Sequence, residues 1–176
     1  MKKFIISIDQ GTTSSRAILF DLKGKPVFSS QKEFTQYFPN SGWVEHNPEE
    51  IWSTTKKVLQ DVIKKAKRIN GKVLTIGITN QRETTVLWDK KTGRPVYNAI
   101  VWQDRRQEVY CEKLRKQNKE TLIFNRTGLL IDSYFSGMKI KWILDNVPKA
   151  KALMNKKQLL FGTIDSFLIW RFTKGK

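Results

Sequence analysis

The first eighty residues alternate between short apolar runs and one long amphipathic segment. "FIISID" and "RAILFD" are rich in β-branched and aromatic residues, and "VFSSQKEFTQYF", residues 27–38, alternates apolar with polar positions. The turn "DLKGKP" joins the second run to the third. We therefore expect three strands in an antiparallel meander that reaches about Phe38.

A helix is predicted next. Asn47 suits the N-cap position and Pro48 suits the first helical position. Apolar residues then recur at helical spacing as far as about Arg68, before "INGK" ends the helix: Ile51, Val58, Leu59, Val62, Ile63 and Ala66. The following "VLTIGITN" is almost continuously apolar, which is typical of a strand in the interior of a sheet. We expect it in the same sheet as the meander.

The second half of the chain mixes strands and helices. "TTVLWDKKTGRPVYNAIVW" predicts strand, turn and strand, and "DRRQEVYCEKLRKQ" predicts a helix that begins at Asp104. Residues 124–157 have a mostly helical pattern. The order of elements implies an α/β fold with a mixed sheet and flanking helices. With 176 residues, of which 39% are hydrophobic, the chain is large enough for one domain with a core.

The formal net charge of +17 raises the question of a nucleic-acid partner. Several lysines fall between the apolar positions of the first predicted helix: Lys56, Lys57, Lys64, Lys65 and Lys67. No basic run is interleaved with aromatic residues, so a solvated surface is favoured over nucleic-acid binding. The single cysteine, Cys111, excludes an internal disulfide and fits a cytoplasmic location. No stretch approaches the ~20 apolar residues of a membrane span.

The segment "DQGTTSSR" has the composition of a phosphate-binding turn. Gly11 lets the backbone approach a ligand closely, and backbone amides and hydroxyls then offer donors to phosphate oxygens from Thr12, Thr13 and Ser14. A carboxylate beside phosphate needs a cation between them, so Asp9 suggests Mg²⁺, bound through water. Arg16 adds positive charge. A polar hairpin turn ended by an aspartate has the same composition and stays open as the alternative.

One further segment suggests a polyol site, and another has a distinctive spacing of residues. "GITNQRETTVLWD" places Gln81, Arg82 and Glu83 directly after a buried strand, where ligands of α/β sheets gather. A guanidinium fork beside a carboxylate suits hydroxyl groups, which both donate and accept; a surface ion pair is the alternative. "YFSGMKIKWILDN", residues 134–146, sets an aromatic residue, a serine, a lysine and a tryptophan at fixed spacings. By helical geometry alone, Trp142 and Ile143 would be core residues.

Together these segments resemble the FGGY family of carbohydrate kinases, whose domains have the actin/Hsp70/sugar-kinase, or ribonuclease-H-like, fold. "DQGTTSSRA" resembles the first phosphate loop of that superfamily, and residues 134–146 resemble the first FGGY signature. "GWVEHNPEEIW", "GITNQRETT", "YNAIVWQDRR" and "LLFGTIDSFLIW" follow the family's order, so the resemblance covers essentially the whole chain. "NQRE" and "GWVEH" point to the branch that phosphorylates glycerol with ATP, forming sn-glycerol 3-phosphate and ADP.

The resemblance implies a role for each candidate residue. The terminal phosphates of ATP or ADP would contact Thr12, Thr13 and Ser14, with Arg16 as the associated basic residue and Asp9 near Mg²⁺. The hydroxyl groups of glycerol would contact Arg82, Glu83 and Tyr134, and Trp102 would cover its carbon skeleton.

The resemblance also implies that residues 1–176 are an incomplete N-terminal kinase domain. Family members continue into a C-terminal domain that carries the catalytic aspartate base and the adenine pocket. No catalytic base is therefore expected in this chain, and Asp165 is assigned a structural role. We expect the chain alone to be inactive, with a separately encoded C-terminal fragment as a candidate partner. A fragment of another FGGY sugar kinase and a non-catalytic basic module on the same fold are the alternatives.

Overall fold

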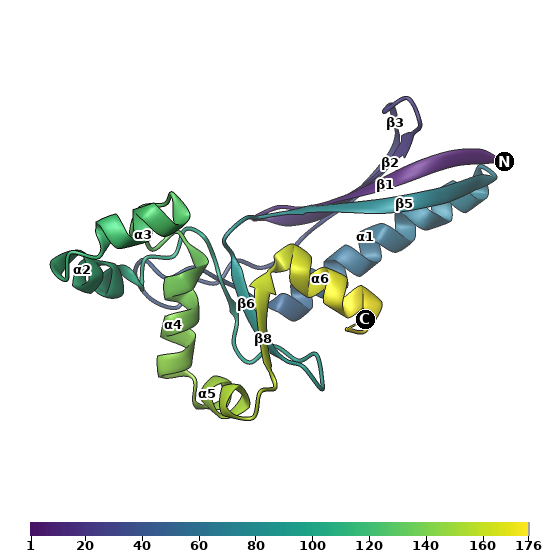
Figure 1. The fold of residues 1–176 in the computed structure, drawn as a ribbon. Coiled ribbons are helices and arrows are strands. Elements are labelled where there is room, and N and C mark those ends of the chain that lie inside the picture. Colours follow the sequence, from purple (N-terminus) through teal and green to yellow (C-terminus); the bar gives the residue numbers. More distant parts are fainter. Residues whose placement is uncertain (176) are drawn as a thin grey trace. The chain divides into compact units, whose positions relative to one another are not determined.

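A computed structural model describes residues 1–175 of the chain (Figure 1). Two compact units divide the chain between them. The first comprises Met1–Gln36, His46–Gln81 and the segment from Ile164 onward. The second comprises Tyr37–Glu45 and Arg82–Thr163. Each unit contains a four-stranded sheet with helices beside it, which confirms the predicted mixed α/β architecture.

The sheet of the first unit has the order β3-β2-β1-β5. Its strands are β1 (Lys2–Gln10), β2 (Ser14–Asp21), β3 (Pro26–Glu33) and β5 (Gly71–Asn80). Neighbours within the meander are antiparallel, and β5 is parallel to β1. The predicted meander and the predicted place of "VLTIGIT" in the same sheet are both confirmed.

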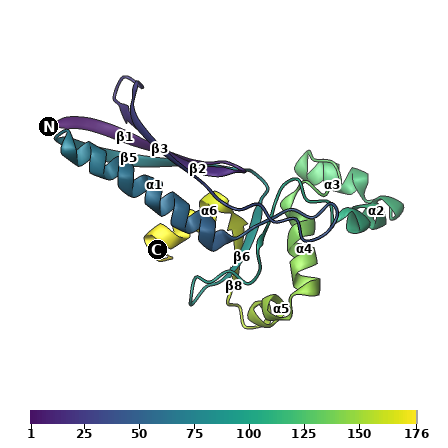
Figure 2. The same ribbon diagram turned by 180° about the vertical axis from the view of Figure 1, so that it is seen from behind.

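Helix α1 (Pro48–Arg68) covers one face of this sheet, with α6 (Ile164–Thr173) on the same face (Figures 1 and 2). The predicted limits of α1 are confirmed, and the Asn47 side chain accepts the Glu49 amide as an N-cap. Alternate residues of β1 and β2 meet the apolar stripe of the helix in one buried cluster: Phe4, Ile6, Ile8, Ala17, Leu19, Val58, Leu59, Val62 and Ala66. This core fixes the strand ends from which the candidate phosphate turn begins.

Two expectations for this sheet are wrong in detail. The third strand ends at Glu33, not near Phe38. The Phe34 amide still pairs with Thr13 O in the register of β2 and β3, but the Thr35 amide donates to the Glu50 carboxylate, and this bond takes the backbone out of the strand ladder. Within the described residues β5 is an edge strand and not an interior one, with Leu74 and Ile76 exposed.

The sheet of the second unit has the order β4-β7-β6-β8. Its strands are β4 (Glu45–His46), β7 (Ala99–Ile100), β6 (Thr85–Asp89) and β8 (Leu159–Thr163). Four helices accompany it: α2 (Glu108–Lys116), α3 (Glu120–Thr127), α4 (Ser136–Asn146) and α5 (Pro148–Asn155). Leu87 and Ile100 of the sheet form a core with Ile143 and Ala150.

The predicted order of elements in this unit is confirmed, with two corrections to boundaries. The second strand of the strand-turn-strand segment shortens to β7, since Pro95 has no N–H for a regular ladder and only bridges to Trp88. The helix predicted from Asp104 begins at Glu108. Asp104 is buried, and its carboxylate accepts the Arg106 amide in a local turn, which holds this segment out of the helix.

The lysines between the apolar positions of α1 lie at its surface. Lys56, Lys57, Lys64 and Lys67 are exposed, and Lys65 is half-buried. Among the described residues, no helix is both long enough and apolar enough to cross a membrane.

The close approach of α1 to the start of β5 generates a stability prediction. A Cβ at Gly71 would overlap the buried Phe4 ring, 2.6 Å from Cδ2, and would lie 2.9 Å from Ala66 O. We expect Gly71→Ala to lower the free energy of unfolding by about 1–3 kcal/mol. Gly77→Ala, in the same strand, is the control because a Cβ there meets nothing within 4 Å. Urea unfolding of both variants tests this; equal stabilities would show that Phe4 and α1 adjust without cost.

Candidate functional site

The predicted phosphate-binding residues lie on the turn between β1 and β2 in the first unit. Asp9 and Arg16 are partners across these antiparallel strands, and Arg16 Nη2 donates to Asp9 Oδ2 at 2.5 Å. Both side chains are partly exposed, Asp9 by 36% and Arg16 by 45%. The positive charge of Arg16 is therefore directed at Asp9 in this structure, and a cation at Asp9 would compete with it for the carboxylate.

Asp9 can serve a metal ion only together with a ligand. Among residues 1–175, no group of three or more His, Cys, Asp or Glu side chains is placed to hold a metal. Mg²⁺ needs only one or two carboxylates when phosphates and water complete its octahedron. The donor set thus fits a Mg²⁺ ion that arrives with a nucleotide, and does not fit an all-protein metal centre.

The carbonyl oxygens of the turn are held by the chain's own donors. Three of these donors are side-chain amides from Gln10, Gln36 and Gln81. Gln10 Nε2 and Gln81 Nε2 donate to Gly11 O at 2.8 and 3.1 Å, and Gln36 Nε2 donates to Thr12 O at 3.0 Å. Two backbone amides complete the set: Phe34 N donates to Thr13 O at 3.3 Å, and Gly11 N donates to Ser14 O at 2.9 Å. With its acceptors satisfied in this way, the turn is suited to present hydroxyl and amide donors to an anion.

Gly11 itself is not required by the fold of the turn. A Cβ there would lie 3.5 Å from Ser14 O, which is ordinary van der Waals contact, and no positive φ occurs at this position. The absent side chain leaves space for a ligand instead, which agrees with the role predicted for Gly11 from the sequence.

A buried histidine supports the turn from behind. His46 Nε2 lies 2.6 Å from Gln36 Oε1, and its imidazole packs edge-on against the Phe34 ring with centroids 5.0 Å apart. Because Gln36 donates its amide nitrogen to Thr12, its oxygen faces His46, so the imidazole carries its proton on Nε2. Burial lowers the pKa of His46 to about 4, against the opposing effects of Glu50 and Gln81. His46 is therefore neutral at pH 7.

The second unit brings three of the four predicted polyol residues together. Glu83 has a positive φ of 63°, and its Oε2 accepts the amide and the hydroxyl of Ser136 at 2.9 and 2.8 Å. Tyr134, two residues before Ser136 in the sequence, lies edge-on to Trp102 with ring centroids 6.0 Å apart. Arg82 is exposed in the turn that carries Glu83. Left-handed backbone at a non-glycine residue is typical of functional sites.

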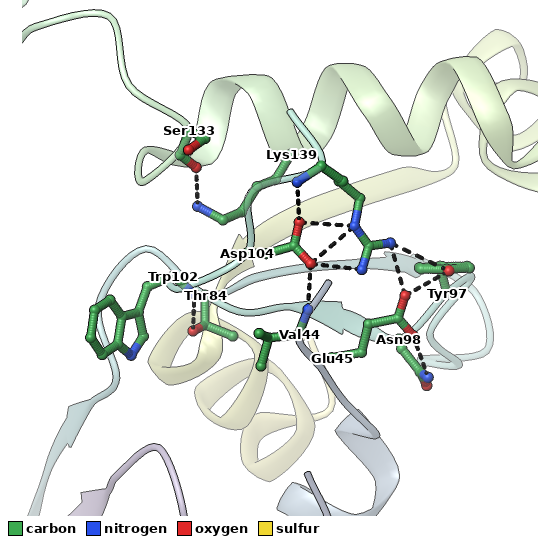
Figure 3. A network of polar contacts seen from close by, with 10 residues as sticks. Val44, Glu45, Thr84, Tyr97, Asn98, Trp102, Asp104, Ser133 and Lys139 are labelled. Atoms are coloured by element: carbon green, nitrogen blue, oxygen red, sulfur yellow. Dashed lines mark hydrogen bonds and ion pairs between the residues drawn. The ribbon is translucent and has the colours of Figure 1, made fainter. Parts of the chain in front are cut away.

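The same unit contains a buried ionic network (Figure 3). The Arg106 guanidinium contacts Asp104 at 2.7–3.0 Å and Glu45 at 2.8 Å, and it lies over the rings of Trp43 and Trp142, which meet edge-on. The side chains of Arg106, Asp104 and Glu45 are at most 5% exposed. Burial lowers the pKa of Arg106, but the hydrogen bonds that Arg106 donates to Asp104 and Glu45 outweigh this effect and raise the pKa above its ordinary value.

The network also fixes backbone near the predicted site. Asp104 Oδ2 accepts the Val44 amide at 2.6 Å, and Glu45 accepts the Tyr97 hydroxyl and the Asn98 amide. Trp102, two residues before Asp104, donates its own amide to Thr84 Oγ1 at 3.3 Å. Sequence reasoning gave no role to this network. The acidic and basic residues of "GWVEH" and "WQDRR" were its only signal.

Removing the guanidinium should be costly because two carboxylates would stay buried without it. We expect Arg106→Met to lower the free energy of unfolding by about 3–5 kcal/mol. Arg105→Met is the matched control, since the Arg105 side chain is 61% exposed and surface ion pairs contribute about 0–1 kcal/mol. Urea titration followed by tryptophan fluorescence measures both. Similar midpoints for the two variants would contradict a dominant role for the network.

His46 should make the first unit sensitive to acid. Its pKa is about 4 in the folded chain and about 6.5 when unfolded, so the unfolded chain binds the proton first. Stability should fall as the pH drops from 6.5 towards 4, by up to about 3 kcal/mol relative to His46→Gln, which cannot titrate. Unfolding free energies at several pH values test this difference, in which the carboxylates cancel. A constant difference between pH 7 and 4.5 would contradict it.

Comparison with known proteins identifies the family. The sequence pattern of the FGGY family of carbohydrate kinases, N-terminal domain, matches residues 4–176. Glycerol kinases of Alkaliphilus metalliredigens and Brachyspira hyodysenteriae are 57% and 58% identical over 176 residues, which are 35% and 36% of those proteins. The chain thus spans about a third of the length of the curated relatives it matches.

Solved structures give the same result. Plasmodium falciparum glycerol kinase, crystallised with ADP, is 36% identical with a TM-score of 0.94 over 99% of this chain and 35% of its own. Gluconate kinase from Lactobacillus acidophilus shares the fold, with a TM-score of 0.83 at 23% identity over 97% of this chain and 33% of its own. From these matches, the chain belongs to the FGGY family of carbohydrate kinases and corresponds to the family's N-terminal domain.

Proposed function

We propose that this chain forms the N-terminal part of an ATP-dependent glycerol kinase, which produces sn-glycerol 3-phosphate and ADP. The observation that carries the proposal is the cluster of Glu83, Tyr134 and Trp102 in a chain that is 57% identical to a glycerol kinase. A carboxylate beside two aromatic rings suits a small polyol, because the carboxylate accepts from hydroxyl groups while the rings cover the carbon chain. Arg82, in the same turn as Glu83, supplies donors to the same ligand.

The turn after β1 is the proposed binding site for the nucleotide's terminal phosphates. Thr12, Thr13 and Ser14 would donate to phosphate oxygens, with Arg16 adding positive charge at the strand end. Asp9 would hold Mg²⁺ through water, and the ion when bound neutralises charge on the phosphates. Arg16 would then leave Asp9 and turn to the nucleotide, since both cations compete for one carboxylate.

The catalytic base and the adenine pocket are proposed to come from the part of the relatives that this chain does not match. β5 offers an attachment point for that part, because it is an edge strand of ten residues with exposed Leu74 and Ile76. A separately supplied C-terminal chain is therefore the proposed partner. Without it, water would reach the phosphates and the reacting groups would not be held in line. The proposed location is the cytoplasm, where the free thiol of Cys111 stays reduced.

The test joins residues 1–176 to the unmatched remainder of the Alkaliphilus metalliredigens glycerol kinase and compares this chimera with the chain alone. A coupled assay measures ADP release with glycerol and Mg-ATP. We expect about 1–100 turnovers per second from the chimera and none from the chain alone. In the chimera, Glu83→Ala should raise the KM for glycerol at least tenfold with the KM for ATP within twofold, since a charged, half-buried acceptor is lost. Gly11→Val should instead raise the KM for ATP at least tenfold and leave the KM for glycerol within twofold.

Glu112→Ala is the matched control, because Glu112 is an exposed glutamate in the same unit as Glu83. Glycerol-dependent turnover by the chain alone would place the base within these residues and overturn that part of the proposal. A chimera that phosphorylates xylulose or gluconate but not glycerol would indicate another sugar kinase. Salt-sensitive DNA retention without turnover would favour a basic binding module.

A further inference from the structure

Lys139 is fully buried although it is a lysine in a chain whose other charges lie mostly at the surface. Its exposed fraction is 0%, and it is among the largest fully buried side chains in the described structure. It shares the buried face of α4 with Ile143, where an apolar residue would be expected. Lysine is almost never fully buried unless it is paired, because removing an ammonium group from water is costly. The position therefore needs a specific explanation.

The contacts of Lys139 are with backbone that carries a predicted substrate residue. Its Nζ donates to Ser133 O at 3.0 Å and also to Tyr134 O (Figure 3 shows the contact with Ser133). On the other side of the same residue, the Tyr134 amide donates to Asp132 Oδ1 at 2.7 Å. Both peptide groups of Tyr134 are thus held, the first by Asp132 and the second by Lys139.

The buried charge of Lys139 is opposed by acids of the same unit. Burial lowers the pKa of Lys139 to about 8, against the opposing effects of Glu83, Asp104 and Asp132, so the ammonium form predominates at pH 7. Asp104 also belongs to the Arg106 network, in which two carboxylates face one guanidinium. Lys139 supplies the second positive charge there and lies within the field of Glu83.

We propose that Lys139 is the positioning residue of the polyol site. Its ammonium group holds the turn at residues 133–134, so that the Tyr134 ring stays against Trp102 and Ser136 stays on the Glu83 carboxylate. The proposal rests on the proposed function for the identity of the ligand, but the geometry it assigns to Lys139 exists without ligand. An apolar residue of the same length would fill the space and lose this geometry.

The experiment compares Lys139→Met with Lys141→Met in the 176-residue chain. Lys141 lies two residues along α4 with a side chain that is 55% exposed, so its substitution removes the same charge from the surface. NMR of the unliganded chain measures amide hydrogen exchange at Tyr134 and Ser136 and the ring contact between Tyr134 and Trp102. For Lys139→Met we expect exchange at least tenfold faster at these amides, a lost ring contact, and unchanged exchange in the β6 strand. Lys141→Met should leave all of these values unchanged.

A second measurement uses the chimera described above. Lys139→Met should raise the KM for glycerol at least tenfold and leave the KM for ATP within twofold, whereas a merely structural role would lower activity without this selectivity. If Lys139→Met does not fold, Lys139→Gln replaces it, because a shorter amide reaches fewer of the carbonyl oxygens.

The outcomes separate the two proposals. Unchanged amide exchange and an unchanged Tyr134–Trp102 contact in a folded Lys139 variant would overturn the positioning role, whatever the KM for glycerol in the chimera. Loss of order throughout the second unit in both Lys139 variants would also overturn it, since Lys139 would then be a general stabilising residue. If protection from exchange is lost selectively at Tyr134, but the wild-type chimera does not phosphorylate glycerol, the positioning role is supported and the proposed function is contradicted.

Discussion

The second unit depends on one buried guanidinium. Arg106 lies over the rings of Trp43 and Trp142 and contacts the carboxylates of Asp104 and Glu45. Buried charges are tolerated only when their partners are in place, so each of these side chains requires the others. Segments distant in sequence are thereby tied together, including Tyr37–Glu45, which lies between β3 and α1 in the sequence yet belongs to the second unit. The Asp104 carboxylate, which contacts Arg106, also accepts the Val44 amide.

The two candidate sites are supported by different kinds of interaction. Neutral amide side chains and a neutral histidine hold the phosphate turn, which suits a site that would receive a highly charged ligand without carrying much charge of its own. Full charges support the polyol cluster, whose expected ligand is neutral: Lys139 donates to Tyr134 O, and Asp104 pairs with Arg106. In a low-dielectric interior such charges act strongly on neighbouring dipoles and fix their orientation.

The sequence patterns correctly predicted the elements that depend on interactions between residues close in sequence. The limits of α1 followed from its cap, its proline and its apolar spacing, and the meander followed from short apolar runs joined by a polar turn. Patterns failed where distant partners take over: Asp104 leaves its predicted helix to bind Arg106 and Val44, and the Thr35 amide turns from the strand ladder to Glu50. Gln36 gave no functional signal, and Lys139 stood out only as part of the spaced pattern of residues 134–146, since the contacts of both side chains are not encoded by residue type and spacing.

Glu83 shows where backbone preference and side-chain chemistry conflict. Its left-handed conformation disfavours every residue with a Cβ by roughly 1–2 kcal/mol, and glycine or asparagine would relieve that strain most easily. Neither offers a carboxylate to Ser136 or to a hydroxyl ligand. The chain therefore keeps a residue that local conformation alone would reject, and such local frustration separates a position selected for chemistry from one selected for folding. A search for sequences that merely stabilise this turn would remove the site.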